Sequence, residues 1–175
     1  MITVVLYEPE KPANTGNIIR TCQAFDMKLA IVGKPSFEIS DKALRRAEMD
    51  YAIGFEIEQY PDYETFLTRH KEEGYYVTRY SDRTYSNYDF SDVKKDIFLM
   101  FGKESTGIPK DILKKHLDHC MRIPMTIDSR SLNLSNSVAI VASEVLRQRN
   151  FAGLSTVETI KGRDFLKNWD PEKDR

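Results

Sequence analysis

The sequence has few cysteines, no long apolar run and no excess charge of either sign. Its 175 residues contain two cysteines, Cys22 and Cys120, which are far apart and form no CxxC pair. We therefore expect small buried thiols in a reducing compartment rather than a disulfide. No segment is apolar for long enough to span a bilayer, and the N-terminus lacks a signal-peptide pattern. These absences predict a cytoplasmic protein without membrane contact.

Charge balance limits how the chain can bind a polyanion. Lys and Arg total 26 and Asp and Glu total 27, which gives a formal net charge of -1. Such a chain has no global positive field, so any nucleic-acid contact must come from a local basic patch. Composition alone does not suggest RNA.

The order of sequence patterns predicts one α/β domain. The length and the 41% hydrophobic content suit a single packed core. The predicted strands are residues 2–7, 29–32, 55–60, 75–80, 97–101 and 121–124, and the predicted helices are residues 15–25, 41–50, 62–73, 109–116 and 136–149. This alternation predicts a mostly parallel sheet with helices on both faces and, taken alone, without a knot. Residues 1–153 form the predicted domain. The polar tail 154–175 carries Phe165 and Trp169 at helical spacing, which suggests a short docked helix.

Ligand sites in parallel sheets lie at the carboxyl ends of strands, so the loops after Tyr7, Phe101 and Pro124 are the candidates. The first loop leads into a helix that Asn14 or Thr15 could cap. Gly16 in the first turn would cost stability unless something approaches the backbone closely. Arg20 offers a planar donor for phosphate. Capping and ligand binding explain this loop equally well.

The second loop runs from the end of an apolar strand at Gly102 to Pro109 at a helix start. It has neither GxGxxG nor the GKS or GKT of a phosphate loop. Glu104 at its centre suits a ligand with positive charge or hydroxyl donors better than a polyphosphate. The alternative is an ordinary turn whose glutamate favours the helix dipole.

The third loop is unusually rich in small polar side chains. Six of the nine residues 129–137 are Ser or Asn, more than one helix cap requires. The excess predicts a loop that satisfies many ligand or backbone hydrogen bonds. The helix that follows has an apolar stripe that could face the core or a partner subunit, consisting of Val138, Val141, Ala142, Val145 and Leu146.

Together the three loops resemble a known family. The segments NTGNIIRTC, LMFGKESTGIP and RIPM…SRSLNLSNSVAIV resemble, in order and spacing, the three motifs of the SPOUT-class RNA methyltransferases. The resemblance covers roughly residues 1–151 and is greatest to the subgroup that methylates the wobble-nucleotide ribose, nucleotide 34 (cytidine or uridine), of leucine tRNAs. It implies an α/β fold with a deep C-terminal trefoil knot, S-adenosylmethionine as cofactor, tRNA as substrate and a homodimer.

The resemblance also implies roles for individual residues. Arg20 corresponds to the catalytic arginine, Asn14 and Glu104 to the polar residues that support it, and Ser131 and Asn133 to the catalytic pair of the third motif. The implied cofactor-binding residues are Thr78, Gly102, Ile123, Met125, Ser131 and Leu132. Two positions depart from the family pattern: YVTRYSD replaces a Thr-Thr-Lys-Gly-like turn, and Ser143 replaces a tyrosine.

Candidate RNA contacts are the cluster Lys42, Arg45 and Arg46, together with Arg122 and Arg130 beside the third loop. For any single one of these residues, a solvated surface charge is the simpler interpretation. We expect no metal, because His116, His119 and Cys120 lack a second ligand pair.

The implied reaction needs little from the protein besides alignment. The cofactor methyl is already activated, so the enzyme must orient a ribose hydroxyl and help remove its proton. Arg20 is a poor base because guanidinium stays protonated, so either a neighbouring phosphate or a transiently neutral Arg20 takes the proton. Three rival functions remain: methylation of another tRNA or rRNA nucleotide, RNA binding without catalysis, and a dehydrogenase. The missing GxGxxG argues against the last.

Overall fold

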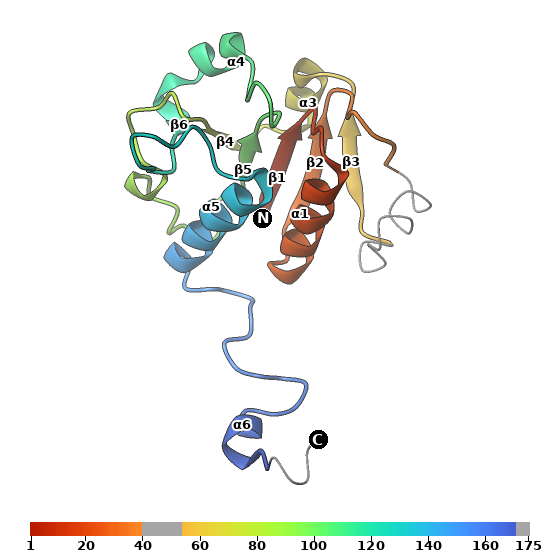
Figure 1. Cartoon of the computed structure of the whole chain (residues 1–175), viewed down its shortest axis with the longest axis vertical. Coiled ribbons are helices and arrows are strands. Elements are labelled where there is room, and N and C mark those ends of the chain that lie inside the picture. The colour runs from red at the N-terminus through yellow and green to blue at the C-terminus, as the bar shows by residue number, and fades with distance from the viewer. Residues whose placement is uncertain (40–53, 171–175) are drawn as a thin grey trace.

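The computed structural model describes residues 1–39 and 54–170 (Figure 1), so Lys42, Arg45, Arg46 and the predicted helix 41–50 lie outside the described residues. Six parallel strands form one sheet in the order β3-β2-β1-β5-β4-β6. The strands are β1 (Ile2–Tyr7), β2 (Lys28–Val32), β3 (Ile57–Tyr60), β4 (Glu73–Val77), β5 (Ile97–Phe101) and β6 (Cys120–Met121). The prediction of a parallel α/β sheet is confirmed.

Helices cover both faces of this sheet. They are α1 (Pro12–Ala24), α3 (Tyr63–Arg69), α4 (Lys110–Lys115) and α5 (Leu134–Gln148). The described residues also form α6 (Phe165–Asn168) in the tail and short 3-10 turns at Tyr85–Asn87 and Leu117–His119. Figure 1 shows α1 and α5 on the near face, whereas α3 and α4 lie toward the other side. None of the helices in the described ranges is long and apolar enough to cross a membrane.

Successive side chains of the central strands point to opposite faces of the sheet and pack in two separate hydrophobic cores. In β1, Val4 and Leu6 pack under α1 and α5, whereas Val5 packs against the side chains of α3 and α4. In β5, Leu99 joins the first core and Met100 the second. A strand buried on both faces reads as a continuous apolar run, which explains ITVVLY and IFLMF.

The apolar stripe of α5 belongs to the core of its own chain. Its five residues are at most 5% exposed and pack in the same core as β1 and α1. The two interpretations that the sequence left open are thereby resolved in favour of the core. An interface with a second copy would have to use another surface.

A crevice opens where the strand order reverses. The chain leaves β1 for α1 on one face, and leaves the neighbouring β5 for α4 on the opposite face. Because the two connections diverge, the carboxyl ends of β1 and β5 are left uncovered between them.

Strand β6 passes between β4 and the loop that follows β4. On one side, the Thr78 amide donates to the Met121 carbonyl at 2.8 Å. On the other side, the Arg122 amide donates to the Arg83 carbonyl at 2.9 Å, and the Ser81 hydroxyl donates to the Cys120 carbonyl at 2.6 Å. The loop 78–85 therefore encloses this segment from two sides. The knot that the family resemblance implies would be tied here, and it stays a prediction.

Several predicted boundaries are wrong, and the caps explain the clearest case. Helix α1 begins at Pro12 with Lys11 as its N-cap, so neither Asn14 nor Thr15 caps it. The amide of Asn14 binds another loop instead, as described below. Helix α5 begins at Leu134 because Asn133 caps it, two residues before the predicted start.

The tail after the domain forms the short helix α6, whose Leu166 is 81% exposed. Figure 1 shows α6 well away from the sheet.

We expect Val141→Asp to unfold the chain. Val141 is fully buried, and an unpaired carboxylate there costs on the order of several kcal/mol against a typical total stability of about 5–15 kcal/mol. Thermal melting followed by circular dichroism measures this, with Val93→Asp, the same substitution at a valine that is 49% exposed, as the matched control. A Val141→Asp protein that melts like wild type, but as a monomer, would place Val141 at a subunit interface instead.

Candidate active site

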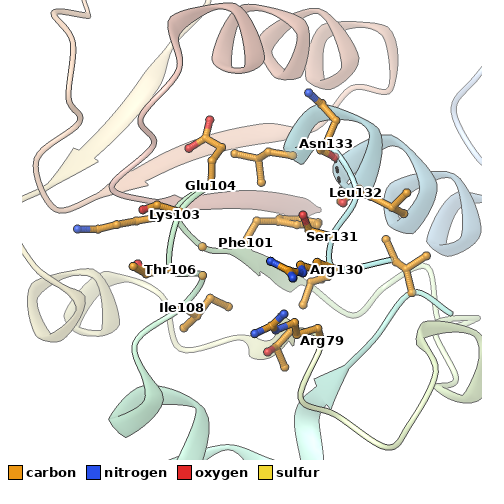
Figure 2. A pocket seen from close by; sticks show the side chains of 18 of the residues that line it. Arg79, Phe101, Lys103, Glu104, Thr106, Ile108, Arg130, Ser131, Leu132 and Asn133 are labelled. Atoms are coloured by element: carbon orange, nitrogen blue, oxygen red, sulfur yellow. Dashed lines mark hydrogen bonds between the residues drawn. The ribbon is translucent and has the colours of Figure 1, made fainter. Parts of the chain in front are cut away.

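A pocket of about 790 Å³ lies at the carboxyl ends of the strands. The loops after β1, β4, β5 and β6 all contribute to its lining (Figure 2). Ten of the predicted site residues line it: Asn14, Thr78, Gly102, Glu104, Ile123, Met125, Arg130, Ser131, Leu132 and Asn133. Segments more than a hundred residues apart in sequence thus meet in one place, as the strand-end argument predicted.

Of the predicted site residues that the structure describes, two do not line this pocket. Arg20 is exposed on α1, six residues after Asn14 and hence about 240° round the helix from it. Arg122 is half-buried beside β6, where its backbone pairs with the segment around Thr84. The roles of both residues stay predictions.

A chain of hydrogen bonds joins the three loops. The Asn14 amide nitrogen donates to the Glu104 carboxylate at 2.9 Å. The Asn133 amide nitrogen donates to the Asn14 amide oxygen at 3.0 Å. The Asn133 oxygen in turn accepts from the backbone amides of Ser135 at 2.9 Å and Asn136 at 3.3 Å. Asn133 therefore caps α5 and also ties the third loop to the first.

The groups at the two ends of this series of hydrogen bonds determine which side-chain atoms donate and which accept. A carboxylate only accepts and a backbone N–H only donates, so the amides of Asn14 and Asn133 can satisfy both ends in one orientation. Glu104 also accepts from the backbone amides of Glu10 at 2.9 Å and Lys11 at 3.2 Å. Three donors thus occupy the Glu104 carboxylate, which makes it a positioning group.

A second set of hydrogen bonds connects the first loop to the second. The Glu10 carboxylate accepts from the backbone amide and the hydroxyl of Ser105, each at 2.8 Å. These hydrogen bonds lower the pKa of Glu10 below its usual range. Beside them, Lys103 forms an ion pair with Glu8, which raises the pKa of Lys103.

Gly102 is required by the backbone of its own loop. A Cβ at this position would lie 2.0 Å from both the Gly107 carbonyl carbon and the Ile108 nitrogen. The loop folds back tightly, because the Gly107 amide donates to the Lys103 carbonyl at 2.9 Å and Gly107 has φ +74°. A side chain at position 102 would therefore collide inside the protein, at a residue that also lines the pocket.

The pocket is positively charged although the chain as a whole is almost neutral. Among the described residues that line it, one is a carboxylate, Glu104, and five are cations, of which Lys103 is paired with Glu8: Lys11, Arg79, Lys103, Lys110 and Arg130. In the view of Figure 2, Arg79 and Arg130 lie below Glu104 and Asn133. Of these five cations, the sequence predicted Arg130 as a site residue but not the other four. The TRY of the unusual YVTRYSD turn was the available signal for Arg79.

The lining fits S-adenosylmethionine. Its size is typical of small-molecule sites, and the buried side chains of Phe101, Ile108 and Leu134 offer an apolar surface for an adenine ring. Glu104 provides negative charge on the same wall, which suits a sulfonium. Within the described part of the chain, no group of three or more His, Cys, Asp or Glu side chains could hold a metal ion.

The fold and the pocket define the class of α/β proteins whose ligand site lies at the carboxyl ends of parallel strands. Within that class, residues 1–143 match the SpoU rRNA Methylase family, and the chain belongs to it. A Geobacillus stearothermophilus relative, 48% identical over 153 residues (87% of this chain, 98% of that protein), is named provisionally as a tRNA (cytidine(34)-2'-O)-methyltransferase. The Escherichia coli K12 protein with that name is 39% identical over 155 residues, 87% of this chain and 97% of that protein.

Solved structures agree with this assignment. A structure concerned with 2-OH methylation of C/U34 on tRNA has a TM-score of 0.77 at 29% identity, covering 86% of this chain and 97% of that one. An AdoMet-bound rRNA methyltransferase from Sinorhizobium meliloti has a TM-score of 0.71 at 26% identity, covering 83% of this chain and 56% of that one.

We predict that Gly102→Ala destabilises the protein even without cofactor, because the collision begins at Cβ. Overpacking of this kind costs about 1–3 kcal/mol, or roughly 2–4 °C of melting temperature per kcal/mol in a chain of this size. Gly102→Val should additionally abolish cofactor binding in calorimetry while far-UV circular dichroism stays native. If Gly102→Ala melts like wild type and loses only cofactor affinity, then the glycine keeps room for the ligand rather than for the loop.

Proposed function

We propose that this chain transfers the methyl group of S-adenosylmethionine to the ribose 2'-hydroxyl of nucleotide 34 of a tRNA, a leucine tRNA in the first instance. The observation that carries the proposal is the hydrogen-bonded chain Glu104–Asn14–Asn133 inside a cationic pocket. The substrate follows the names of the two relatives described above and the C/U34 structure. We assign the reaction to the cytoplasm.

In this proposal each loop has a separate task. S-adenosylmethionine, when bound, supplies an already activated methyl group. Glu104 holds the first loop in place through the amides of Glu10, Lys11 and Asn14. Ser131 lines the pocket together with Asn14, Glu104 and Asn133 and can bind the acceptor hydroxyl. Arg20 orients that hydroxyl and a neighbouring phosphate.

We further propose that the enzyme is a homodimer in which Arg20 serves the partner's pocket. Arg20 is exposed and lies outside the lining of the pocket in its own chain. Helices α1 and α5 lie together on one face of the sheet, and a second copy placed against this pair would complete the site with its own arginine. The interface uses the outward sides of these helices, since the apolar stripe of α5 is in the core.

The direct test is transfer of labelled methyl from S-adenosylmethionine to total tRNA that lacks the modification, followed by nucleoside mapping. The proposal expects label at the 2'-oxygen of nucleotide 34. Label at another tRNA position would make that nucleotide the substrate instead. Transfer to rRNA in a parallel reaction would make rRNA the substrate. Cofactor binding without any transfer would identify an RNA-binding protein without catalysis.

Arg20→Ala should lower methyl transfer by at least about a hundredfold, as loss of a group that assists proton transfer does, while calorimetry shows unchanged cofactor affinity. Arg69→Ala, an exposed arginine at the end of α3, is the matched control and should keep full activity. Wild-type turnover by Arg20→Ala would remove the arginine from the mechanism.

Mixing two inactive variants tests the shared site. Arg20→Ala has an intact pocket, and Gly102→Val has an intact Arg20, so a mixed dimer contains one complete site if the arginine acts across the interface. Activity should return when the two proteins are refolded together. If native mass spectrometry shows mixed dimers and activity stays absent, Arg20 acts within its own chain.

A further inference from the structure

Tyr80 is an exposed aromatic residue at the edge of the pocket. It follows β4 by three residues, is 59% exposed and lines the pocket together with Arg79. Among the described residues that line the pocket, the other aromatic side chain is Phe101, which is 2% exposed. One exposed aromatic side chain is not unusual on a protein surface, so the surroundings of Tyr80 must decide whether it has a function.

Two cations hold the ring of Tyr80 in place. The Arg79 guanidinium carbon lies 5.0 Å from the ring centroid, and the Lys110 Nζ lies 4.6 Å from it. Arg79 Nη2 also donates to the Tyr80 hydroxyl at 3.2 Å, and together the two cations lower the pKa of Tyr80 below its usual range. The backbone of Tyr80 is fixed as well, because its amide donates to the Thr78 hydroxyl at 3.3 Å. Without a ligand, the ring therefore has a defined position with cations over it, and these cations would move to the phosphates when a base stacks on the ring.

These three side chains have the composition of a single-stranded nucleic-acid site. Bases that have left their stack regain stacking on exposed aromatic rings, and neighbouring Arg and Lys side chains bind the phosphates that connect them. A ribose hydroxyl can enter a pocket only if its nucleotide leaves the stack of its neighbours. The edge of the pocket is where an unstacked base would then lie.

We propose that Tyr80 is the stacking platform for a base of the RNA substrate at or next to the methylated nucleotide, with Arg79 and Lys110 binding the adjoining phosphates. This inference rests on the proposed RNA 2'-O-methyltransferase function and adds a substrate-positioning residue to it.

The test compares Tyr80→Leu with Tyr80→Phe in the full chain. Leucine keeps an apolar side chain but removes the π face, whereas phenylalanine keeps the face and removes the hydroxyl. Tyr80→Leu should raise the KM for tRNA about tenfold, the scale of losing one base-aromatic stack, and Tyr80→Phe should stay within about threefold of wild type. Calorimetry should show S-adenosylmethionine affinity unchanged in both.

Phe151→Leu is the matched control, because Phe151 is 40% exposed and does not line the pocket. An unchanged tRNA KM in Tyr80→Leu would overturn the inference while leaving the proposed function intact. A tenfold loss of cofactor affinity in Tyr80→Leu would also overturn it, since the ring would then contact the cofactor. A wild-type chain that methylates no tRNA would overturn the function and the platform together.

Discussion

The hydrogen bonds from Glu104 through Asn14 to Asn133 are the interaction on which the pocket depends. They connect the loops after β1 and β5 with the start of α5, and they close on the backbone amides that α5 leaves unpaired at its first turn. Asn14 is buried, Glu104 is half-buried and Asn133 is exposed, so the loss of either neighbour leaves a polar atom of Asn14 unsatisfied away from water. The same few atoms thus cap a helix, hold three loops together and shape a ligand site.

The parallel sheet makes this network possible. Since β1 and β5 are neighbours whose following helices lie on opposite faces, their carboxyl ends stay open and the loops can meet above them. The enclosure of β6 by the loop after β4 brings Thr78, Arg79 and Tyr80 to the same place. Local concentration of cations there lets an almost neutral chain present a positive pocket to a polyanion.

Much of this was accessible from sequence, for identifiable reasons. Strands 2–7 and 97–101 were predicted with their observed bounds because strands buried on both faces read as continuous apolar runs. The family resemblance located nine of the lining residues, and the charge pattern beside the third loop located the tenth, Arg130. The position of Asn14 in α1 was not predictable, because an Asn before an apolar helix usually caps it, and its true partner is ninety residues away. The steric requirement for glycine at position 102 likewise depends on how the loop folds back onto Gly107 and Ile108, and no local sequence pattern predicts that contact.

A double-mutant cycle on cofactor affinity tests the network most directly. Asn133→Asp keeps the oxygen that caps α5 but removes the donor to Asn14, and Asn14→Ala removes the acceptor and the donor to Glu104. If the loops are joined through this contact, the double variant binds S-adenosylmethionine better than the sum of the single losses predicts, with a coupling of about 0.5–3 kcal/mol. Losses that add to within about 0.3–0.5 kcal/mol would show that the two loops act independently and would contradict the account.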